Sequence, residues 1–126
     1  MKKVIVTSEA PKAVGPYSQA VAVGNFLFCA GQIPLDPATG ELIEGDVTAQ
    51  TERVLQNVVG VLRANGMTFA NVVKSTVFMV DLANFAAMNA VYSKYFSEPF
   101  PARSTIQVAA LPKGSQVEIE VIAVAE

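Results

Sequence analysis

The stretch 116–124, close to the C-terminus, limits the possible folds more than any other part of the chain. Because the side chains of a β-strand alternate between two faces, every second residue lies on the same side. One side is entirely apolar and consists of Val117, Ile119, Val121, Ala123 and Ala125. The other side begins with the polar residues Gln116, Glu118 and Glu120 and ends with the apolar residues Ile122 and Val124. A solvated face has no reason to end in two aliphatic residues, so the pattern predicts helices over one side and another subunit over the other.

The composition also indicates association between copies of the chain. The chain has 126 residues, a length typical of one domain, and we predict a single domain over residues 1–126. Hydrophobic residues make up 52% of the chain and charged residues 16%, below the share of about 25% charged residues that is usual. A small domain has a large surface to cover, so we expect apolar surface to be buried against other copies.

Periodicity and turn residues predict the remaining elements. Strands are predicted at 3–7, 19–23, 26–30, 72–80 and 104–108. One helix is predicted from a cap at residue 46 or 48 to about residue 65, and a second over 82–96. Gly24 and Asn25 form the two-residue turn of a hairpin. Asp46 or Thr48 is expected to cap the first helix, and Asp81 the second.

The apolar residues of the first predicted helix follow helical spacing, as Val54, Val58, Val61 and Leu62 do. Gly60 lies among them and costs about 1 kcal/mol relative to alanine, which suggests that the helix lies close to a sheet there. Helices interspersed with hairpins predict an α+β fold, a mixed β-sheet with two helices packed on one face.

The lack of histidine and the presence of only one cysteine exclude several kinds of catalytic and metal site. The chain has no histidine, the residue most often used as a general base or metal ligand. Its single cysteine, Cys29, lies in an apolar run without a nearby cation, so we interpret it as a buried thiol. A disulfide framework, a zinc cluster and a phosphate-binding glycine loop are absent, and we expect neither metal nor cofactor.

Charge and hydropathy limit the expected partners. The net charge is −2, and no basic footprint of a nucleic-acid-binding protein is visible. No apolar run approaches the roughly 18 residues of a membrane span, and the run that follows Met1 is too short for a signal peptide. We expect a cytoplasmic protein that binds neither nucleic acid nor membrane.

Arg103 is the strongest candidate for a binding residue. It shares one face of its predicted strand with Thr105. If the last two predicted strands pair as a hairpin, Glu118 and Glu120 lie on that same face. An arginine can hold a carboxylate through two parallel N–H bonds, and a glutamate can move a proton or position a water molecule. The alternative is a salt bridge between Arg103 and one of these glutamates, without any function.

Three further residues are candidates, each with a structural alternative. Asn89 falls on the apolar stripe of the second predicted helix, where it could instead be a core amide that bonds to a loop. Tyr17 follows Pro16 and could simply be a packed aromatic residue. Gly31 ends a predicted strand and could serve only the turn, although a residue without a β-carbon also lets a ligand approach its backbone N–H.

Six segments, in order along the chain, resemble the Rid family, also called YjgF-type proteins. They are 15–20 (GPYSQA), 31–34 (GQIP), 73–78 (VKSTVF), 89–92 (NAVY), 100–104 (FPARS) and 117–120 (VEIE). The segment around Arg103, followed by Leu111-Pro112-Lys113 and the last of these motifs, is similar to the RidA branch, the 2-iminobutanoate/2-iminopropanoate deaminases.

The resemblance implies a fold like that of bacterial chorismate mutase, in a homotrimer with three clefts between subunits. It also implies hydrolysis of reactive 2-imino acids and enamines to 2-keto acids and ammonia, without a cofactor, as a form of metabolite damage control. Arg103 matches the arginine that holds the substrate carboxylate, and Glu118 the glutamate that activates water. Tyr17, Gly31 and Asn89 match positions that line the pocket.

The chain departs from the family pattern at two positions. Thr105 stands where many relatives have cysteine, so a hydroxyl replaces a thiol in the expected substrate-binding pocket. Ala30 replaces a serine that is common before Gly31. Two other functions remain alternatives: a non-catalytic regulator that binds a keto acid or amino acid, and the nuclease or translation-inhibitor role attached to some relatives, against which the acidic net charge and the lack of histidine argue.

Overall fold

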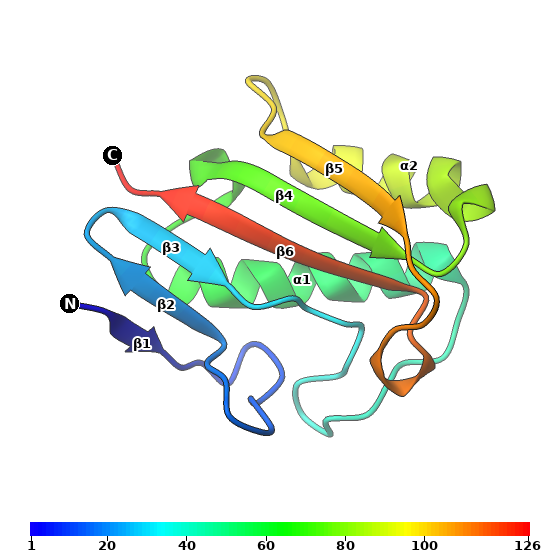
Figure 1. Ribbon diagram of the computed structural model, residues 1–126, viewed down its shortest axis with the longest axis horizontal. Coiled ribbons are helices and arrows are strands. Elements are labelled where there is room, and N and C mark those ends of the chain that lie inside the picture. The colour runs from blue at the N-terminus through cyan, green and yellow to red at the C-terminus, as the bar shows by residue number, and fades with distance from the viewer.

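A six-stranded mixed β-sheet forms the frame of the protein, and two α-helices lie behind it (Figure 1). The computed structural model describes all residues from Met1 to Glu126. Its elements are β1 (Lys3–Ile5), β2 (Ala20–Val23), β3 (Phe26–Cys29), α1 (Val47–Ala64), β4 (Val72–Met79), α2 (Phe85–Tyr95), β5 (Ala102–Gln107) and β6 (Val117–Val124). The strand order across the sheet is β1-β2-β3-β6-β4-β5. The predicted α+β fold, with both helices on one face, is confirmed.

The hairpin between β2 and β3 forms as predicted. Val23 pairs with Phe26, which leaves Gly24 and Asn25 as the two-residue turn. Gly24 has a φ of 57°, in the left-handed region that such turns require and that glycine adopts without strain.

The predicted hairpin between β5 and β6 is wrong. β4 lies between these two strands, parallel to β5 and antiparallel to β6. The reason is that β4, α2 and β5 form a crossover unit, in which a helix joins two parallel neighbouring strands. The loop after β5 then passes the end of β4 before the chain returns as β6.

The core lies between the sheet and the helices. The four stripe residues of α1, which are Val54, Val58, Val61 and Leu62, are buried. The apolar face of β6 meets them, with Ile119 and Val121 among the buried residues. This burial confirms that the helices cover the apolar face of β6, as predicted. Full burial of such a side chain stabilises the fold by about 1.5–3 kcal/mol.

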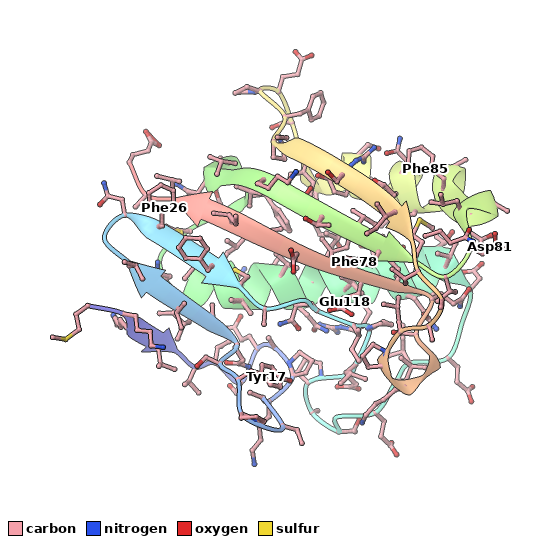
Figure 2. The ribbon with its side chains drawn as sticks, in the orientation of Figure 1. Tyr17, Phe26, Phe78, Asp81, Phe85 and Glu118 are labelled. Atoms are coloured by element: carbon pink, nitrogen blue, oxygen red, sulfur yellow. The ribbon has the colours of Figure 1, made fainter.

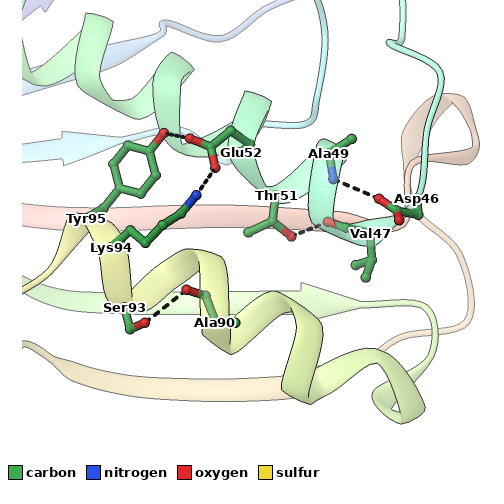
Figure 3. Close-up of polar contacts among 9 residues, drawn as sticks. All are labelled: Asp46, Val47, Ala49, Thr51, Glu52, Ala90, Ser93, Lys94 and Tyr95. Atoms are coloured by element: carbon green, nitrogen blue, oxygen red, sulfur yellow. Dashed lines mark hydrogen bonds and ion pairs between the residues drawn. The ribbon is translucent and has the colours of Figure 1, made fainter.

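Of the two predicted aspartate caps, Asp46 caps its α-helix and Asp81 caps a 3₁₀ helix that precedes the other α-helix. The Asp46 carboxylate accepts a hydrogen bond from the backbone N–H of Ala49 at 3.0 Å, so Asp46 rather than Thr48 caps α1 (Figure 3). Asp81 caps a short 3₁₀ helix, Leu82–Asn84, and α2 begins only at Phe85. The second helix therefore starts later than predicted.

A polar contact joins the two helices behind the sheet. Glu52 of α1 accepts hydrogen bonds from the hydroxyl of Tyr95 and from Nζ of Lys94, the latter at 2.9 Å (Figure 3). Both partners lie near the C-terminal end of α2. Neither α1 nor α2 has the length and hydropathy that a membrane-spanning helix needs.

The expectation that Gly60 lets α1 lie close to the sheet is wrong. The glycine instead lies against the N-terminal segment. A β-carbon at Gly60 would lie 2.8 Å from the carbonyl carbon of Glu9. Because that neighbour is backbone, it cannot move aside as a flexible side chain could. The glycine thus lets the segment that follows β1 cross the helix.

The face of the sheet opposite the helices is uncovered within one chain. Phe28 and Ile122 are register partners on this face, and Phe26 stacks on Phe28 with 5.9 Å between ring centroids. Phe26, Phe28 and Ile106 are 42–46% exposed. Exposed apolar side chains that gather on one face, as the stacked Phe26 and Phe28 do, mark interaction surfaces.

Candidate active site

The predicted site residues divide into two groups on opposite faces of the sheet. Arg103 is the register partner of Ser75, and Glu118 is the register partner of Phe78. Register partners point to the same face, and residues three apart on a strand point to opposite faces. The expectation that Arg103 and Glu118 share one wall of a pocket is therefore wrong within a single chain. In Figure 2, Phe85 of α2 lies at the upper right, and Glu118 and Tyr17 lie lower in the view.

The first group surrounds the guanidinium group of Arg103 on the helix side of the sheet. Its Nη1 donates a hydrogen bond to Oδ1 of Asn89 at 2.8 Å. Its Cζ lies 4.7 Å from the centroid of the Tyr92 ring and 5.5 Å from that of Phe85. Both distances permit a cation–π attraction. Strand β5 and helix α2 together hold the arginine.

Arg103 has no carboxylate partner. The ion pairs of the chain join Arg63 to Glu9 and Lys94 to Glu52, so the alternative of a salt bridge to Glu118 or Glu120 is wrong. A guanidinium group has five N–H donors, and the bond to Asn89 is its one hydrogen bond here. A half-buried cation with unused donors is suited to bind an anion.

Thr105 lies on the same face as Arg103, two residues further along β5. Its hydroxyl oxygen is the one buried side-chain polar atom of the chain without a hydrogen-bond partner. Buried polar groups are nearly always paired, so this hydroxyl is available to a ligand or to a neighbouring subunit.

Asn89 contacts the arginine rather than a loop, so the alternative of a core amide bonded to a loop is wrong. Its carbonyl oxygen is the acceptor for Arg103, which orients the side chain and leaves the amide N–H₂ without a partner inside the chain. A free amide donor beside a cation adds to the hydrogen-bonding capacity of this group.

The second group is centred on Glu118 of β6. This half-buried carboxylate has no ion pair or hydrogen bond with another residue. Burial raises the pKa of Glu118 above its ordinary value, and the nearby charge of Glu120 raises it further. A carboxylate with a raised pKa is a better proton acceptor near neutral pH than an ordinary glutamate.

Gly31 lies directly against Glu118. A β-carbon at residue 31 would be 2.8 Å from the carboxyl carbon of Glu118. The adjacent Gln32 forms a two-way backbone bridge with Ile119, at 2.9 and 3.1 Å. Gly31 therefore does more than serve a turn, because it makes room for the glutamate side chain.

Glu118, Gly31 and Tyr17 line one cavity of about 540 Å³. Its other walls come from the segments 11–19, 31–40 and 112–113. Tyr17 is 54% exposed, so the alternative of a packed aromatic residue is wrong, and its hydroxyl accepts a hydrogen bond from the backbone N–H of Val14 at 3.4 Å. The cavity is large enough for a small organic acid.

Asn57 of α1 fixes one wall of this cavity and was not singled out from the sequence. It is fully buried, and its amide nitrogen donates to the carbonyls of Ile33 and Leu35 at 3.2 and 3.0 Å. Its carbonyl oxygen accepts two bonds from Arg53. Asn57 lies on the apolar stripe of α1. A polar residue on an apolar stripe was the signal that indicated Asn89, and the same signal could have identified Asn57.

Gln19 plays a similar part on the opposite wall. It is buried, and its side chain bonds to both backbone groups of Thr7 and to the carbonyl of Pro11, at 2.8–3.0 Å. These bonds hold the segment that leads to Tyr17. Gln19 opens the predicted strand 19–23, and one polar residue at the end of a strand offers no sequence signal for such a role.

Cys29 is buried, as expected, and burial raises the pKa of its thiol to about 12. A thiol with so high a pKa is inert as a nucleophile at neutral pH. No group of three or more His, Cys, Asp or Glu side chains is arranged to hold a metal ion.

Comparison with known proteins identifies the family. Residues 7–125 match the family described as Endoribonuclease L-PSP. Protein DfrA of Myxococcus xanthus is 56% identical over 125 residues, which cover 98% of this chain and 95% of that protein. The 2-iminobutanoate/2-iminopropanoate deaminase of Capra hircus is 49% identical over 124 residues, which cover 98% of this chain and 90% of that protein.

The fold of this chain is also similar to that of relatives with solved structures. The crystal structure of E. coli TdcF with bound serine superposes with a TM-score of 0.93 at 45% identity, over 98% of this chain and 99% of that one. A family match over nearly the whole chain, with relatives aligned almost end to end, shows that this chain belongs to the endoribonuclease L-PSP family, the Rid or YjgF-type proteins.

Proposed function

We propose that the protein hydrolyses 2-imino acids, such as 2-iminobutanoate and 2-iminopropanoate, to 2-keto acids and ammonia. The observation that carries this proposal is Arg103, a half-buried guanidinium group with no carboxylate partner and with unused donors. A cation held in this way by Asn89 and aromatic rings is prepared for an anion. A planar carboxylate fits the two parallel N–H bonds of a guanidinium group.

The complete site needs two copies of the chain. Arg103 and Glu118 point to opposite faces of one sheet, so one substrate molecule cannot contact both within a single chain. The uncovered sheet face is rich in exposed apolar side chains. A homotrimer like that of bacterial chorismate mutase would cover this face and bring Arg103 of one subunit to Glu118 of the next, in three intersubunit clefts.

In the proposed reaction, the substrate iminium carbon accepts a water molecule. The Glu118 carboxylate takes a proton from the water as its oxygen bonds to C2, and the π electrons of the C=N bond move to nitrogen. Glu118 returns the proton to nitrogen, the C2–N bond breaks, and the hydroxyl oxygen re-forms a C=O bond. The hydroxyl proton leaves with ammonia, as ammonium. A positioned acid–base group contributes about 10²–10⁴-fold to such a step.

The relatives support the same substrate class. The Capra hircus relative is named a 2-iminobutanoate/2-iminopropanoate deaminase, and TdcF was crystallised with serine, a small amino acid with a carboxylate. Myxococcus xanthus DfrA has a name that states no reaction. The assignment of imine hydrolysis to this chain therefore rests on the chemistry of Arg103 and Glu118 together with these names.

The test is an assay in which a 2-imino acid is generated in situ and its loss is followed with and without the protein. Arg103→Ala should abolish the acceleration while the oligomer remains intact by light scattering. Arg103→Lys should also be impaired, because a point charge cannot replace two parallel N–H bonds.

If Arg103→Ala is as active as the parent, the proposal is wrong. Binding of a 2-keto acid without turnover above the free-solution rate would instead support a regulatory binding protein. Cleavage of RNA by the purified protein, lost on mutation of cavity residues, would support a nuclease.

A further inference from the structure

We infer that Tyr92 is a positioning residue, anchored by Ser75, which fixes the orientation of the Arg103 guanidinium group for carboxylate binding. The inference rests on the proposed function and extends it to two residues outside the group that meets the substrate. Tyr92 lies on α2, Ser75 on β4 and Arg103 on β5. The three residues therefore connect the helix layer to the two strands at one edge of the sheet.

The ring of Tyr92 provides a platform under the cation. The Arg103 Cζ lies 4.7 Å from the ring centroid, closer than the 5.5 Å that separates it from the ring of Phe85. Tyr92 is 6% exposed, whereas Phe85 is 37% exposed. A cation–π contact is stronger where water is excluded, so Tyr92 is the better anchor of the two.

The hydroxyl of Tyr92 is itself anchored. It lies 2.6 Å from the hydroxyl of Ser75, in a buried hydrogen bond. Ser75 is fully buried and is the register partner of Arg103 on the neighbouring strand. The strand residue beside the arginine thus holds the ring on which the arginine rests. Burial raises the pKa of Tyr92, so the phenol remains protonated at neutral pH.

The ring of Tyr92 is also held by stacking on another aromatic ring. Tyr92 stacks on Phe96, with 4.2 Å between centroids and 18° between planes. Phe96 meets the edge of Phe69 at 4.7 Å. A ring that is held at its hydroxyl by Ser75 and along its face by Phe96 cannot tilt freely, and it passes this restraint on to the guanidinium group.

The consequence for binding is preorganisation. An arginine side chain has several rotatable bonds, and each must be ordered when both N–H donors meet a carboxylate. Asn89 fixes one end of the guanidinium group through Nη1, and the Tyr92 ring fixes its plane. The donors that remain free are thereby aimed before the substrate arrives.

The test compares Tyr92→Phe, Tyr92→Leu and Ser75→Ala with the parent. The affinity for 2-oxobutanoate is measured by calorimetry, and KM and kcat are measured in the imine assay. Tyr92→Phe and Ser75→Ala should each weaken binding about threefold, and the double variant should be no weaker than either single one, because both remove the same anchor. Tyr92→Leu should weaken binding about tenfold, since it also removes the ring.

Tyr95→Phe is the matched control. It removes a phenol hydroxyl from the same helix, but that hydroxyl bonds to Glu52 rather than to the Arg103 group. Its affinity should equal that of the parent. A merely structural role of Tyr92 would lower thermal stability and the fraction of folded protein, whereas a positioning role raises Kd and KM together in fully folded protein.

A measurement without any ligand separates this inference from the proposed function. The ¹⁵N–¹H NMR signals of the Arg103 guanidinium group should show an upfield ring-current shift and slow rotation in the parent. Tyr92→Phe should speed the rotation, and Tyr92→Leu should reduce the shift to the smaller part that the more distant Phe85 ring contributes. Parent-like affinity and parent-like Arg103 signals in Tyr92→Phe and Ser75→Ala would overturn the inference. An ordered Arg103 in a parent protein that neither binds 2-oxobutanoate nor hydrolyses imines would overturn the proposed function alone.

Discussion

Gly31 and Glu118 are so close that a β-carbon on the first would lie 2.8 Å from the carboxyl carbon of the second. The backbone bridge between Gln32 and Ile119 holds the two residues in this relation. The glycine segment and strand β6 therefore cannot separate to admit a larger residue, and the side chain of Glu118 is the part that would have to move.

Gly31→Ala is expected to displace the Glu118 carboxylate and to lower kcat for imine hydrolysis about 100-fold, since misplacement by about 1 Å can cost that much. The measurement is steady-state turnover of imine generated in situ. Gly66→Ala is the matched control, because nothing lies within 4 Å of a β-carbon there; it is expected to lower stability but not kcat. Equal activity of Gly31→Ala and the parent would contradict a role for the Glu118 position.

The loss of activity at low pH should follow the protonation of Glu118. A general base acts only when deprotonated, so activity falls as the pH drops through its pKa. Because burial and Glu120 raise that pKa above the ordinary value of 4.5, the fall should occur at a higher pH than for an ordinary glutamate.

Glu120→Gln removes the like charge and should move this loss of activity to lower pH, while the effect of burial remains. The measurement is kcat/KM from pH 4 to 8, roughly the range in which a raised carboxylate pKa is expected. Glu9→Gln, at an exposed glutamate paired with Arg63, should leave the profile in place. A loss of activity that Glu120→Gln does not shift would mean that a group other than Glu118 controls it.

Asn57→Ala should destabilise the protein by about 2 kcal/mol, because it leaves two partly buried carbonyls without their donor. Those carbonyls belong to Ile33 and Leu35, in the wall of the Glu118 cavity. Stability is measured by urea unfolding, and kcat/KM is expected to fall about tenfold at temperatures where the variant is folded, since the wall loses its position. Asn65→Ala serves as the control, since the one hydrogen bond of the Asn65 side chain goes to the sulfur of Met67, at 3.7 Å.

Phe28→Asp should disrupt the proposed oligomer. The substitution places a charge on the uncovered sheet face, and an unpaired charge buried in an interface costs several kcal/mol. Light scattering should then show a smaller particle, and imine hydrolysis should be lost with it, because Arg103 and Glu118 no longer meet. Gln56→Asp, on the exposed side of α1, should change neither. An active Phe28→Asp monomer would show that one chain suffices.

The elements of this fold could largely be predicted from the sequence. The cap at Asp46, the Gly24 turn and the apolar stripe of α1 depend on residues within a few positions of one another. The two faces of β6 follow from alternation alone. Such features are local, so the sequence pattern carries them directly.

The pairing of strands that are not joined by a tight turn depends on distant parts of the chain, and the predicted pairing of β5 with β6 was wrong. The loop after β5 has a length that suits a hairpin with β6, but β4 occupies that place because the crossover through α2 pairs it with β5. This single fact decides that Arg103 and Glu118 face opposite sides of the sheet.

The candidate site likewise combines residues that the sequence indicates with contacts that only the tertiary structure creates. The residue types by themselves indicated Arg103, Asn89 and Glu118, because polar groups in apolar patterns stand out in the sequence. Their contacts, with Nη1 of Arg103 on Asn89 and its guanidinium group over Tyr92, exist only where α2 packs across β4 and β5. The sequence determined which groups are available, and long-range packing decided which of them meet, since strand order and register fix the direction of every side chain.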